Sequence, residues 1–500
     1  MVRASRVPVV LVCLSLVGQT PDPAVGKRLA LTEAIQIALQ NNLQVGIAQQ
    51  TRESTRAGVM ISEGPFDWNL AASAQVSHLK SASSGPLYRG GPVASATYTS
   101  TNRTLTADLN KLFAWGGTLA LNYSPAYSYT RSQVGGVTGT SLYPYTGSFT
   151  ATYTQSLLQN FGYAATTSNL VIARKNAESA DFQFQLAIIA LVAKTEGQYW
   201  DVVFAERDLV NKQAALTLAQ KQLKENSIRV QVGTMAPIEV TSAEAQVAQA
   251  EQNIIAAEAQ ALNTKDALLQ ALYPNAGRPA SLIPTDGPTL SHIKLDEPAA
   301  VKMALERRVE LKSARIAKDI AQVSEKLAVN RTLPKLDAFV AYNGASDNYG
   351  AIGPVNSDLG GAKYPGYTVG LRFAMPLQNR QAKGQLSQAR ASLRNSELGL
   401  QDQELNVTLQ VRTAIRNVEA AEKGVKAAEK TRYYQEKNLD AEQKKFENGM
   451  STNFVVLQVM TNLDNAKSAE LRAQIDYAKF VTALEVAVGN LMEARNFTIK

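Results

Sequence analysis

Hydrophobic and polar residues follow two different periods along this chain, and each change of period marks a new element. From Leu31 to about Glu63 the apolar positions recur every three to four residues, which predicts an amphipathic helix with Thr32 as its N-cap. Gly64 and Pro65 end this pattern. The period then becomes two, and a strand with one apolar and one polar face is predicted. Its apolar positions are Phe66, Trp68, Leu70, Ala72, Ala74 and Val76.

Further alternating segments follow in two groups. In the first group, residues 104–110 and 119–123 are expected to form a hairpin joined by the turn 114–117, and a strand is predicted around Phe149 to Tyr153. Gly-, Ser-, Tyr- and Pro-rich loops are expected at 81–96 and 124–147. In the second group, residues 336–342 and 367–375 alternate in the same way, with a glycine-rich loop at 344–366 between them.

A very long helical pattern follows each group of strands. About 65 residues before Gln231 lack proline, which predicts a helix of roughly 100 Å at 1.5 Å per residue. Gly233 ends this helix, and Pro237 suits the first position of a returning helix that runs to about Leu272. The second pattern runs over roughly 380–448, turns at Gly449, and returns over 452–494.

The chain repeats itself. Gly449 follows Gly233 by 216 residues, whereas Ala304 follows its counterpart Ala38 by 266 residues, so the first copy carries about 50 extra residues between the strands. The predicted organisation is a first repeat at 31–272, a proline-rich equatorial linker at 273–297, a second repeat at 298–494 and a tail at 495–500.

The N-terminus reads as a secretory signal peptide. Arg3 and Arg6 precede an apolar run over residues 7–17, and residues 1–23 are expected to be removed. Cys13 is the only cysteine and lies within this segment, so the mature chain is expected to have neither disulfide nor thiol chemistry. Since no later run reaches about 18 apolar residues, a crossing of the bilayer is expected to use strands.

The alternating strands predict an α+β membrane protein. Strands with one apolar and one polar face are typical of an outer-membrane barrel, and a barrel in hydrocarbon must be closed. Four strands per chain cannot close one, so several chains are expected to share a barrel. A trimer would have 12 strands without the extra hairpin and 18 with it, and 12 is the expectation here. The alternative is a secreted β-sandwich with a helical stalk.

Little in the chain suggests catalysis. The two histidines, His78 and His292, have no partners at metal-ligand spacing, and a phosphate-binding GxxxxGK[ST] motif is lacking. We therefore expect no enzyme activity, cofactor or metal. The net charge of +8 comes from basic residues interleaved with acidic ones, so nucleic-acid binding is not expected.

Several segments together resemble the TolC-type outer-membrane efflux proteins. They are Leu31 to Leu43, Gln155 to Gly162, Val232 to Val240, Met375 to Arg380 and the Gly449 turn. The resemblance implies a homotrimer with one shared β-barrel in the outer membrane of a Gram-negative-type cell, surrounded by outer-membrane lipid. It also implies a long periplasmic α-helical, coiled-coil tunnel. Its partners would be a periplasmic membrane-fusion adaptor and an energised inner-membrane pump.

The same resemblance implies roles for individual residues. The periplasmic tip that contacts the adaptor would comprise Val232, Gly233, Thr234, Met235, Pro237, Asn448, Gly449, Met450 and Ser451. The chain departs from the family at the gate, because Val455 and Gln458 replace carboxylates and Ser451 replaces an arginine. Ser156 also replaces a proline. Glu239 is left as the possible tip gate, whose neutralisation should lower cation selectivity. The polar strand residues expected to face the lumen are Asp67, Asn69, Asp337 and Arg372.

Three functions remain open from the sequence. The leading hypothesis is a passive exit duct of a tripartite efflux pump. The same architecture would serve as the exit duct of a type I protein secretion system. A non-conducting surface stalk is a third hypothesis, but it does not explain alternating strands at the same place in both repeats.

Overall fold

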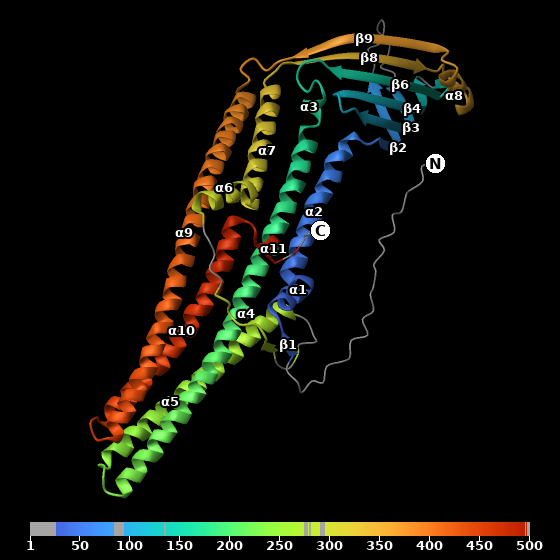
Figure 1. The fold of residues 1–500 in the computed structure, drawn as a ribbon. Helices are drawn as coiled ribbons and strands as arrows, with labels where there is room; N and C mark the ends of the chain where they lie inside the picture. Colours follow the sequence, from blue (N-terminus) through green and yellow to red (C-terminus); the bar gives the residue numbers. More distant parts are fainter. Residues whose placement is uncertain are drawn as a thin grey trace. The chain divides into compact units, whose positions relative to one another are not determined.

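The computed structural model describes residues 27–84, 95–134, 137–274, 279, 282–290, 296–495 and 497 (Figure 1). The chain divides into two compact units. The helical unit comprises Met1–Ile47, Gln185–Arg308 and Val407–Lys500, and the sheet unit comprises Ala48–Phe184 and Val309–Asn406. The expected signal peptide at 1–23, His292 and most of the tail at 495–500 lie outside the described residues.

One antiparallel sheet dominates the sheet unit. In the described residues its six long strands follow the order β2 (Asn69–Ser84), β3 (Ser95–Leu112), β4 (Gly117–Val134), β6 (Tyr145–Ser156), β8 (Lys335–Ala345) and β9 (Tyr364–Ala374) (Figure 1). A short strand, β5 (Val137–Thr140), pairs with the far part of β4. The expectation of four strands per chain was therefore wrong, because β3 and β4 of the extra segment are inserted between β2 and β6.

The strands β3 and β4 are also longer than predicted. The pairing of β3 with β4 continues out to Ala96 and Val134, far beyond the apolar alternation that identified the hairpin. The additional part is rich in Thr, Ser and Tyr, which favour strands but give no apolar period. For that reason sequence reasoning placed the additional part of β4 in a loop at 124–147 and left residues 97–103 of β3 unassigned.

The predicted turn between β3 and β4 is confirmed. The Phe113 amide donates to the Gly117 carbonyl at 2.8 Å, and the Gly116 amide donates to the Phe113 carbonyl at 2.9 Å. Gly116 has a φ of +92°, which a residue with a Cβ rarely adopts. The Gly162 amide donates to the Trp115 carbonyl, so this turn lies at the end of the sheet where the chain enters α3 (Tyr163–Thr166). We call this the inner end of the sheet and the opposite end the outer end.

Helices leave the inner end of the sheet. The predicted first helix is in fact two. α1 (Leu31–Asn41) belongs to the helical unit, and most of α2 (Leu43–Glu63) belongs to the sheet unit, where a turn of 3-10 helix at Gly64–Phe66 precedes β2. The other helices of this unit are the first part of α4 (Ser168–Gln231), α7 (Val309–Arg331), α8 (Ile352–Gly360) and the first part of α9 (Arg380–Glu447). Ion pairs link neighbouring helices, including Lys175 to Asp319 at 3.0 Å. Among the described residues no helix has both the length and the apolar character needed to cross a membrane.

The helical unit is built on long hairpins. α4 continues into this unit and is followed by α5 (Ile238–Leu272), and α9 is followed by α10 (Asn453–Val488); α6 (Glu297–Arg307) and α11 (Leu491–Ala494) are shorter. Its main core gathers fully buried side chains from several of these elements. They include Tyr199, Val202, Leu268, Leu272 and Ile475. Burial of each large aliphatic side chain of this kind stabilises the folded state by roughly 1.5–3 kcal/mol.

The start of α1 is held by a distant loop. β1 (Lys27–Leu29) pairs in parallel with β7 (Leu282–Pro284), and this brings Asp286 to the helix N-terminus. The Leu31 amide donates to the Asp286 carboxylate at 2.6 Å, which satisfies a free helical donor. The prediction of Thr32 as N-cap was wrong: Ala30 occupies that position and has no side-chain cap.

Arg495, which follows α11, is held to the helical unit by two ion pairs. Arg495 forms ion pairs with Glu196 and Glu485, each at 2.9 Å. Burial raises the pKa of the Glu485 carboxyl, although Arg495 opposes this effect. Because Glu196 is almost fully buried, removal of the Arg495 guanidinium would leave an unpaired charge in the interior.

Candidate functional sites at the hairpin turns and on the strand faces

The first hairpin turn is a Schellman motif centred on Gly233. The Gly233 amide donates to the Val230 carbonyl at 3.0 Å, and the Thr234 amide donates to the Arg229 carbonyl at 2.9 Å. Gly233 has a φ of +72°. α5 starts at Ile238, with Pro237 at the N-cap rather than at the predicted first helical position. The sequence prediction of a left-handed glycine at this turn is confirmed.

The second turn repeats this geometry at Gly449. The Gly449 amide donates to the Phe446 carbonyl at 3.1 Å, the Met450 amide donates to the Lys445 carbonyl at 2.8 Å, and Gly449 has a φ of +70°. A Cβ added to either glycine would meet no atom within 4 Å. Only the backbone conformation therefore demands glycine at these two positions.

The two turns are packed against each other. The Arg229 guanidinium lies 4.6 Å from the centre of the Phe446 ring. Beneath them a small core contains buried side chains of α4, α9 and α10, with Met235 and Val455 packed against it. Val455 occupies one of the positions where the resemblance implies a gating carboxylate, and its side chain packs against this core instead.

Apolar side chains remain exposed around both turns. Val232 and Met450 are 67% and 72% exposed, and Ile238 and Phe454 are 66% and 69% exposed. Ile238 and Phe454 were missed by the sequence analysis. Each stands five residues after its turn glycine, so the 216-residue offset that relates the turns would have identified them as a pair. Exposed apolar groups gathered in this way are typical of protein interaction sites.

Glu239 belongs to a polar network that joins the two hairpins. Its carboxylate accepts a hydrogen bond from the Asn453 amide of α10 at 3.0 Å. The Asn453 side-chain oxygen accepts in turn from Asn226 at 2.8 Å and from Gln222 at 3.3 Å, both on α4. Gln222, Asn226 and Asn453 are buried. A satisfied buried network of this kind fixes one arrangement of the helices.

Ser451 and Asn448 act within the second turn. The Ser451 hydroxyl donates to the buried Glu442 carboxylate, which Lys445 also contacts at 2.9 Å. These hydrogen bonds, from Ser451 first and then Lys445, lower the pKa of the Glu442 carboxyl. This contribution to stability is present above the carboxyl's ordinary pKa and is lost as the pH falls through the lowered one. The Asn448 amide donates to the Lys444 carbonyl.

Three of the four expected lumen residues share the polar face of the sheet. Asn69 pairs with Asn110 at one edge, and Asp337 pairs with Arg372 at the other. The Ser156 hydroxyl donates to Asp337 at 2.9 Å. Asp67 does not belong to this set, because it lies in the turn before β2 starts.

The opposite face carries a continuous apolar band. Strand pairing aligns Leu70, Leu109, Leu121, Ala151, Tyr342 and Tyr367 in one row across all six long strands. Parallel rows add Leu119 with Tyr153, and Val340 with Val369. Several of these side chains are largely exposed, among them Leu70 at 71% and Val369 at 79%. In the described residues most of this face has no covering element, and an apolar surface this wide is typical of a contact with another molecule or with a membrane.

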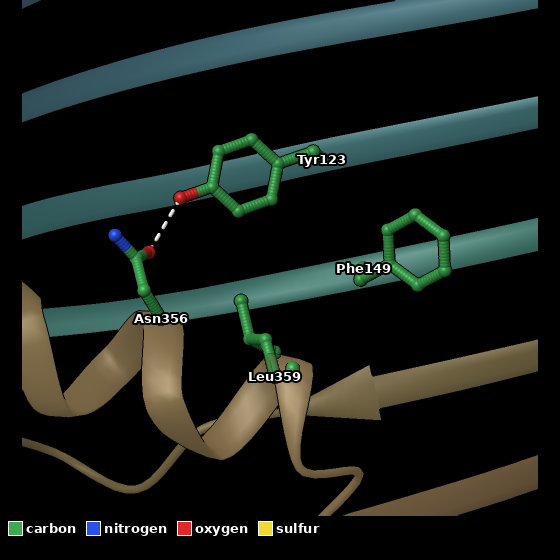
Figure 2. Close-up of a pocket in the computed structure, with 5 residues that line it drawn as sticks. Tyr123, Phe149, Asn356 and Leu359 are labelled. Atoms are coloured by element: carbon green, nitrogen blue, oxygen red, sulfur yellow. Dashed lines mark hydrogen bonds between the residues drawn. The ribbon is translucent and has the colours of Figure 1, made fainter.

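The helix α8 lies on the outer part of this face, inside a segment predicted to be a loop. Figure 2 shows Tyr123 of β4 and Phe149 of β6 beside Asn356 and Leu359 of α8, and the Tyr123 hydroxyl donates to Asn356 at 2.6 Å. These residues and Gly360 line an open hollow of about 380 Å³. Val355 is fully buried, and a Cβ on Gly147 would come within 2.6 Å of it, so α8 needs a glycine beneath it.

Neither the histidines nor the carboxylates of the described part of the chain form a metal-binding cluster. His78 lies in β2 and contacts the Thr101 hydroxyl at 2.9 Å. No cluster of three or more His, Cys, Asp or Glu side chains that could hold a metal ion occurs among the described residues. The features with a functional geometry are the two turns and the two faces of the sheet.

Comparison with known proteins gives a family match. The sequence matches the outer membrane efflux protein family over residues 119–272 and 300–490, which is more than half of the chain. The first matched segment begins in β4 and ends with the hairpin of the first repeat. The second begins in α6, before the strands of the second repeat, and ends just after its hairpin.

Individual relatives agree with this match. The outer membrane protein TolC of Vibrio cholerae is 26% identical over 229 residues, which cover 45% of this chain and 49% of that protein. TolC of Escherichia coli is 27% identical over 338 residues, which cover 65% of this chain and 66% of that protein. The chain thus matches about half to two thirds of the length of these relatives. The CmeC outer membrane channel of Campylobacter jejuni has a similar fold, with a TM-score of 0.64 at 14% identity over 92% of this chain and 86% of that one.

Proposed function

Because the chain belongs to the outer membrane efflux protein family and is thus an outer-membrane protein, we propose that it forms the exit duct of a tripartite efflux pump. One observation carries this proposal. The sheet has an apolar face and a polar face, and its two edge strands, β2 and β9, have no partner on their outer side among the described residues. In hydrocarbon such edges leave backbone groups unsatisfied, so they must pair with other copies.

A homotrimer satisfies this requirement. Three copies of a six-stranded sheet would form one barrel of 18 strands rather than the 12 expected from the sequence. The apolar band would then face outer-membrane lipid. Asn69, Asp337 and Arg372 would face the aqueous lumen, in keeping with the alternation of lumen and lipid residues in such barrels. The long hairpins α4–α5 and α9–α10 would form the periplasmic tunnel.

The two turns would form the periplasmic tip that binds a membrane-fusion adaptor. Their exposed apolar side chains, Val232, Ile238, Met450 and Phe454, support this role because apolar anchors dominate protein interfaces. Thr234 and Pro237 shape the first turn, and Gly233 and Gly449 fix both. The energised partner would be an inner-membrane pump, and the chain itself lacks the phosphate-binding GxxxxGK[ST] motif.

We also propose that Glu239 holds the tip closed through a hydrogen bond between the two hairpins, rather than through the charge of its carboxylate as expected from the sequence. Its carboxylate accepts a hydrogen bond from Asn453 and thereby joins the first hairpin to the second. Opening would then require this bond to break. The role as a cation-selective ring is a weaker candidate, because the carboxylate is already engaged within one chain.

The duct of a type I protein secretion system stays an alternative, since the energised partner selects the substrate in both systems. A non-conducting stalk is disfavoured by the polar face that runs along all the long strands. The family is one of channels rather than of enzymes, and we propose no catalytic activity.

Oligomeric state and conductance test the proposal together. The detergent-solubilised protein should have three times the mass of one chain by light scattering, and it should give ion conductance in planar bilayers. The reason is that only a closed barrel satisfies the edges of β2 and β9. A monomeric mass with an intact strand signal in circular dichroism would overturn the shared barrel. A trimer without conductance would instead favour the stalk.

The orientation of the sheet is tested at Trp115. Trp115 lies in the short β3–β4 turn at the inner end and is half exposed. Since short turns face the periplasm in such barrels, Trp115→Cys should react with an impermeant maleimide only after the outer membrane is permeabilised. The only natural cysteine, Cys13, lies in the expected signal peptide. Labelling of intact cells would place this turn outside and reverse the orientation.

A further inference from the structure

The apolar face of β2, β3 and β4 ends in a group of basic residues at its outer end. Strand pairing puts Val76, Arg103 and Tyr127 in one row, and Lys80, Thr99 and Arg131 in a row nearer the outer end. Lys80 and Arg131 stand two strands apart, about 10 Å at the usual strand spacing. We call Lys80, Arg103 and Arg131 the basic rim. All three side chains are exposed.

Aromatic residues flank the apolar band at both ends. At the inner end the Phe113 ring stacks on Trp115 and lies near Tyr153, and Trp68 lies beside Lys111 just before β2. At the outer end the Tyr127 ring contacts Tyr145, and Tyr129 lies two residues further along β4. The part of β4 between Leu119 and Tyr127 is about 27 Å long at 3.4 Å per residue. Aromatic girdles separated by an apolar band of this scale mark the two interfaces of a membrane. The basic rim therefore lies at the level of lipid headgroups.

The rim lacks acidic partners. Between Trp68 and Ser168 the sequence contains one acidic residue, Asp108, and five basic ones. Asp108 is on the polar face, where it accepts a hydrogen bond from Asn122 at 2.7 Å. In the described part of the chain no carboxylate forms an ion pair with Lys80, Arg103 or Arg131. Three cations without acidic partners on a lipid-facing surface attract anions from outside the protein.

A groove adjoins the rim and offers room for a hydrocarbon chain. It has a volume of about 330 Å³, and Val76, Leu105, Pro125 and Ile352 of α8 are among its lining residues. Arg103 borders it, with its guanidinium 5.3 Å from the centre of the Tyr127 ring. The groove thus has an apolar floor and a cation at its outer margin. This arrangement is complementary to a lipid that has an acyl chain and an anionic headgroup.

We propose that the basic rim binds the phosphate headgroup of an anionic membrane lipid while an acyl chain of the same lipid lies in the groove beside α8. Charge complementarity selects the headgroup, and the apolar lining selects a lipid over a free anion. The inference rests on the proposed function only in that these strands face lipid.

Lipid titration followed by native mass spectrometry tests this site. The intact oligomer in detergent should bind phosphatidylglycerol more tightly than phosphatidylcholine. The triple variant K80Q/R103Q/R131Q should lose this preference, by about fivefold for each cation and about 100-fold in all. The matched control K423Q/K430Q/R416Q removes the same charge from exposed positions of α9 and should keep the preference.

Further arms distinguish the possible failures. In the unmutated protein, added salt should weaken phosphatidylglycerol binding, whereas inorganic phosphate at the same ionic strength should not weaken it further. Equal loss in the rim and control variants, or displacement by inorganic phosphate alone, would overturn the lipid site. Conductance of the rim variant in planar bilayers is measured in parallel. If the rim variant conducted ions but kept its preference for phosphatidylglycerol, this inference would be refuted and the proposed duct would stand.

Discussion

Replacement of either turn glycine by valine should abolish export without unfolding the protein. Gly233 and Gly449 have φ values of +72° and +70°, which a β-branched residue adopts only at a cost of about 1–3 kcal/mol. The main core of the helical unit and the small core beneath the turns are made by other residues, so the strain should be relieved by a local shift. That shift would move Val232, Ile238, Met450 and Phe454, the apolar groups proposed to contact an adaptor.

The expected result is a normal oligomer with a defective tip. Gly233→Val and Gly449→Val should reach the membrane at normal mass, and cross-linking to the adaptor should weaken by about 5- to 150-fold, the equivalent of 1–3 kcal/mol. Dye accumulation in cells that carry the adaptor and pump should rise accordingly. Both measurements use the same membranes, so that expression and insertion are checked together.

Gly424→Val provides the matched control. Gly424 is exposed in the helix α9, has room for a side chain and does not have a positive φ. The same side chain added there should leave adaptor cross-linking and export unchanged. If both turn variants exported normally, the adaptor contact would not depend on the turn geometry, and its proposed place at the tip would be wrong.

Local sequence signals gave much of the fold. The turn at Gly233 and its copy at Gly449 were predictable because a helix reversal requires a left-handed residue, and the offset between the repeats identified both. The alternation in residues 68–76 likewise predicted the apolar face of β2. In each case the cause lies within a few residues of the effect.

Features that depend on distant partners could not be predicted in this way. Asp286 caps a helix that begins 255 residues earlier, so no local pattern links it to Leu31. The helix α8 depends on the space above Gly147, which only the assembled sheet creates. The outer parts of β3 and β4 have little apolar alternation because much of that length lies beyond the apolar band, so the length of these strands was missed. The hairpin itself was predicted, but the count of four strands left it out of the barrel, because its local pattern does not show that β3 pairs with β2 and β4 with β6.

The same limit applied to the gate. Sequence comparison directed attention to positions after the second glycine that usually carry carboxylates, and it left Glu239 as the remaining candidate. Its partner, Asn453, is an ordinary residue at the start of α10 with no signal in the sequence. Asn453 comes within 3.0 Å of Glu239 only because α4, α5 and α10 pack together. The same packing buries Asn453 with Asn226 and Gln222.

Replacement of Asn453 by aspartate should open the tip. The new carboxylate would lie beside that of Glu239 in place of a hydrogen-bond donor, and two such charges at about 4 Å repel by about 4 kcal/mol at an effective dielectric of 20. The helices α5 and α10 should separate, and single-channel conductance in planar bilayers should increase at neutral pH. Lower pH should reverse this increase in conductance. When two carboxylates are in contact, repulsion raises the pKa of one of them, and the proton that it takes up at lower pH forms a hydrogen bond between the two.

A compensating change at Glu239 makes this prediction specific. In the double variant N453D/E239Q the glutamine amide can donate to the new aspartate, which can still accept from Asn226 and Gln222, so the link re-forms with its polarity reversed. Conductance should return to the level of the unmutated protein and lose its dependence on pH. Asn462→Asp, which adds the same charge at an exposed position of α10, should have little effect. Asn453→Asp also removes the longer hydrogen bond of 3.4 Å from the Asn453 amide to the Glu239 backbone carbonyl, and only the link between the two side chains is restored in the double variant. If conductance stayed increased in the double variant, or did not increase in Asn453→Asp, the side-chain hydrogen bond between Glu239 and Asn453 would not be what holds the tip closed.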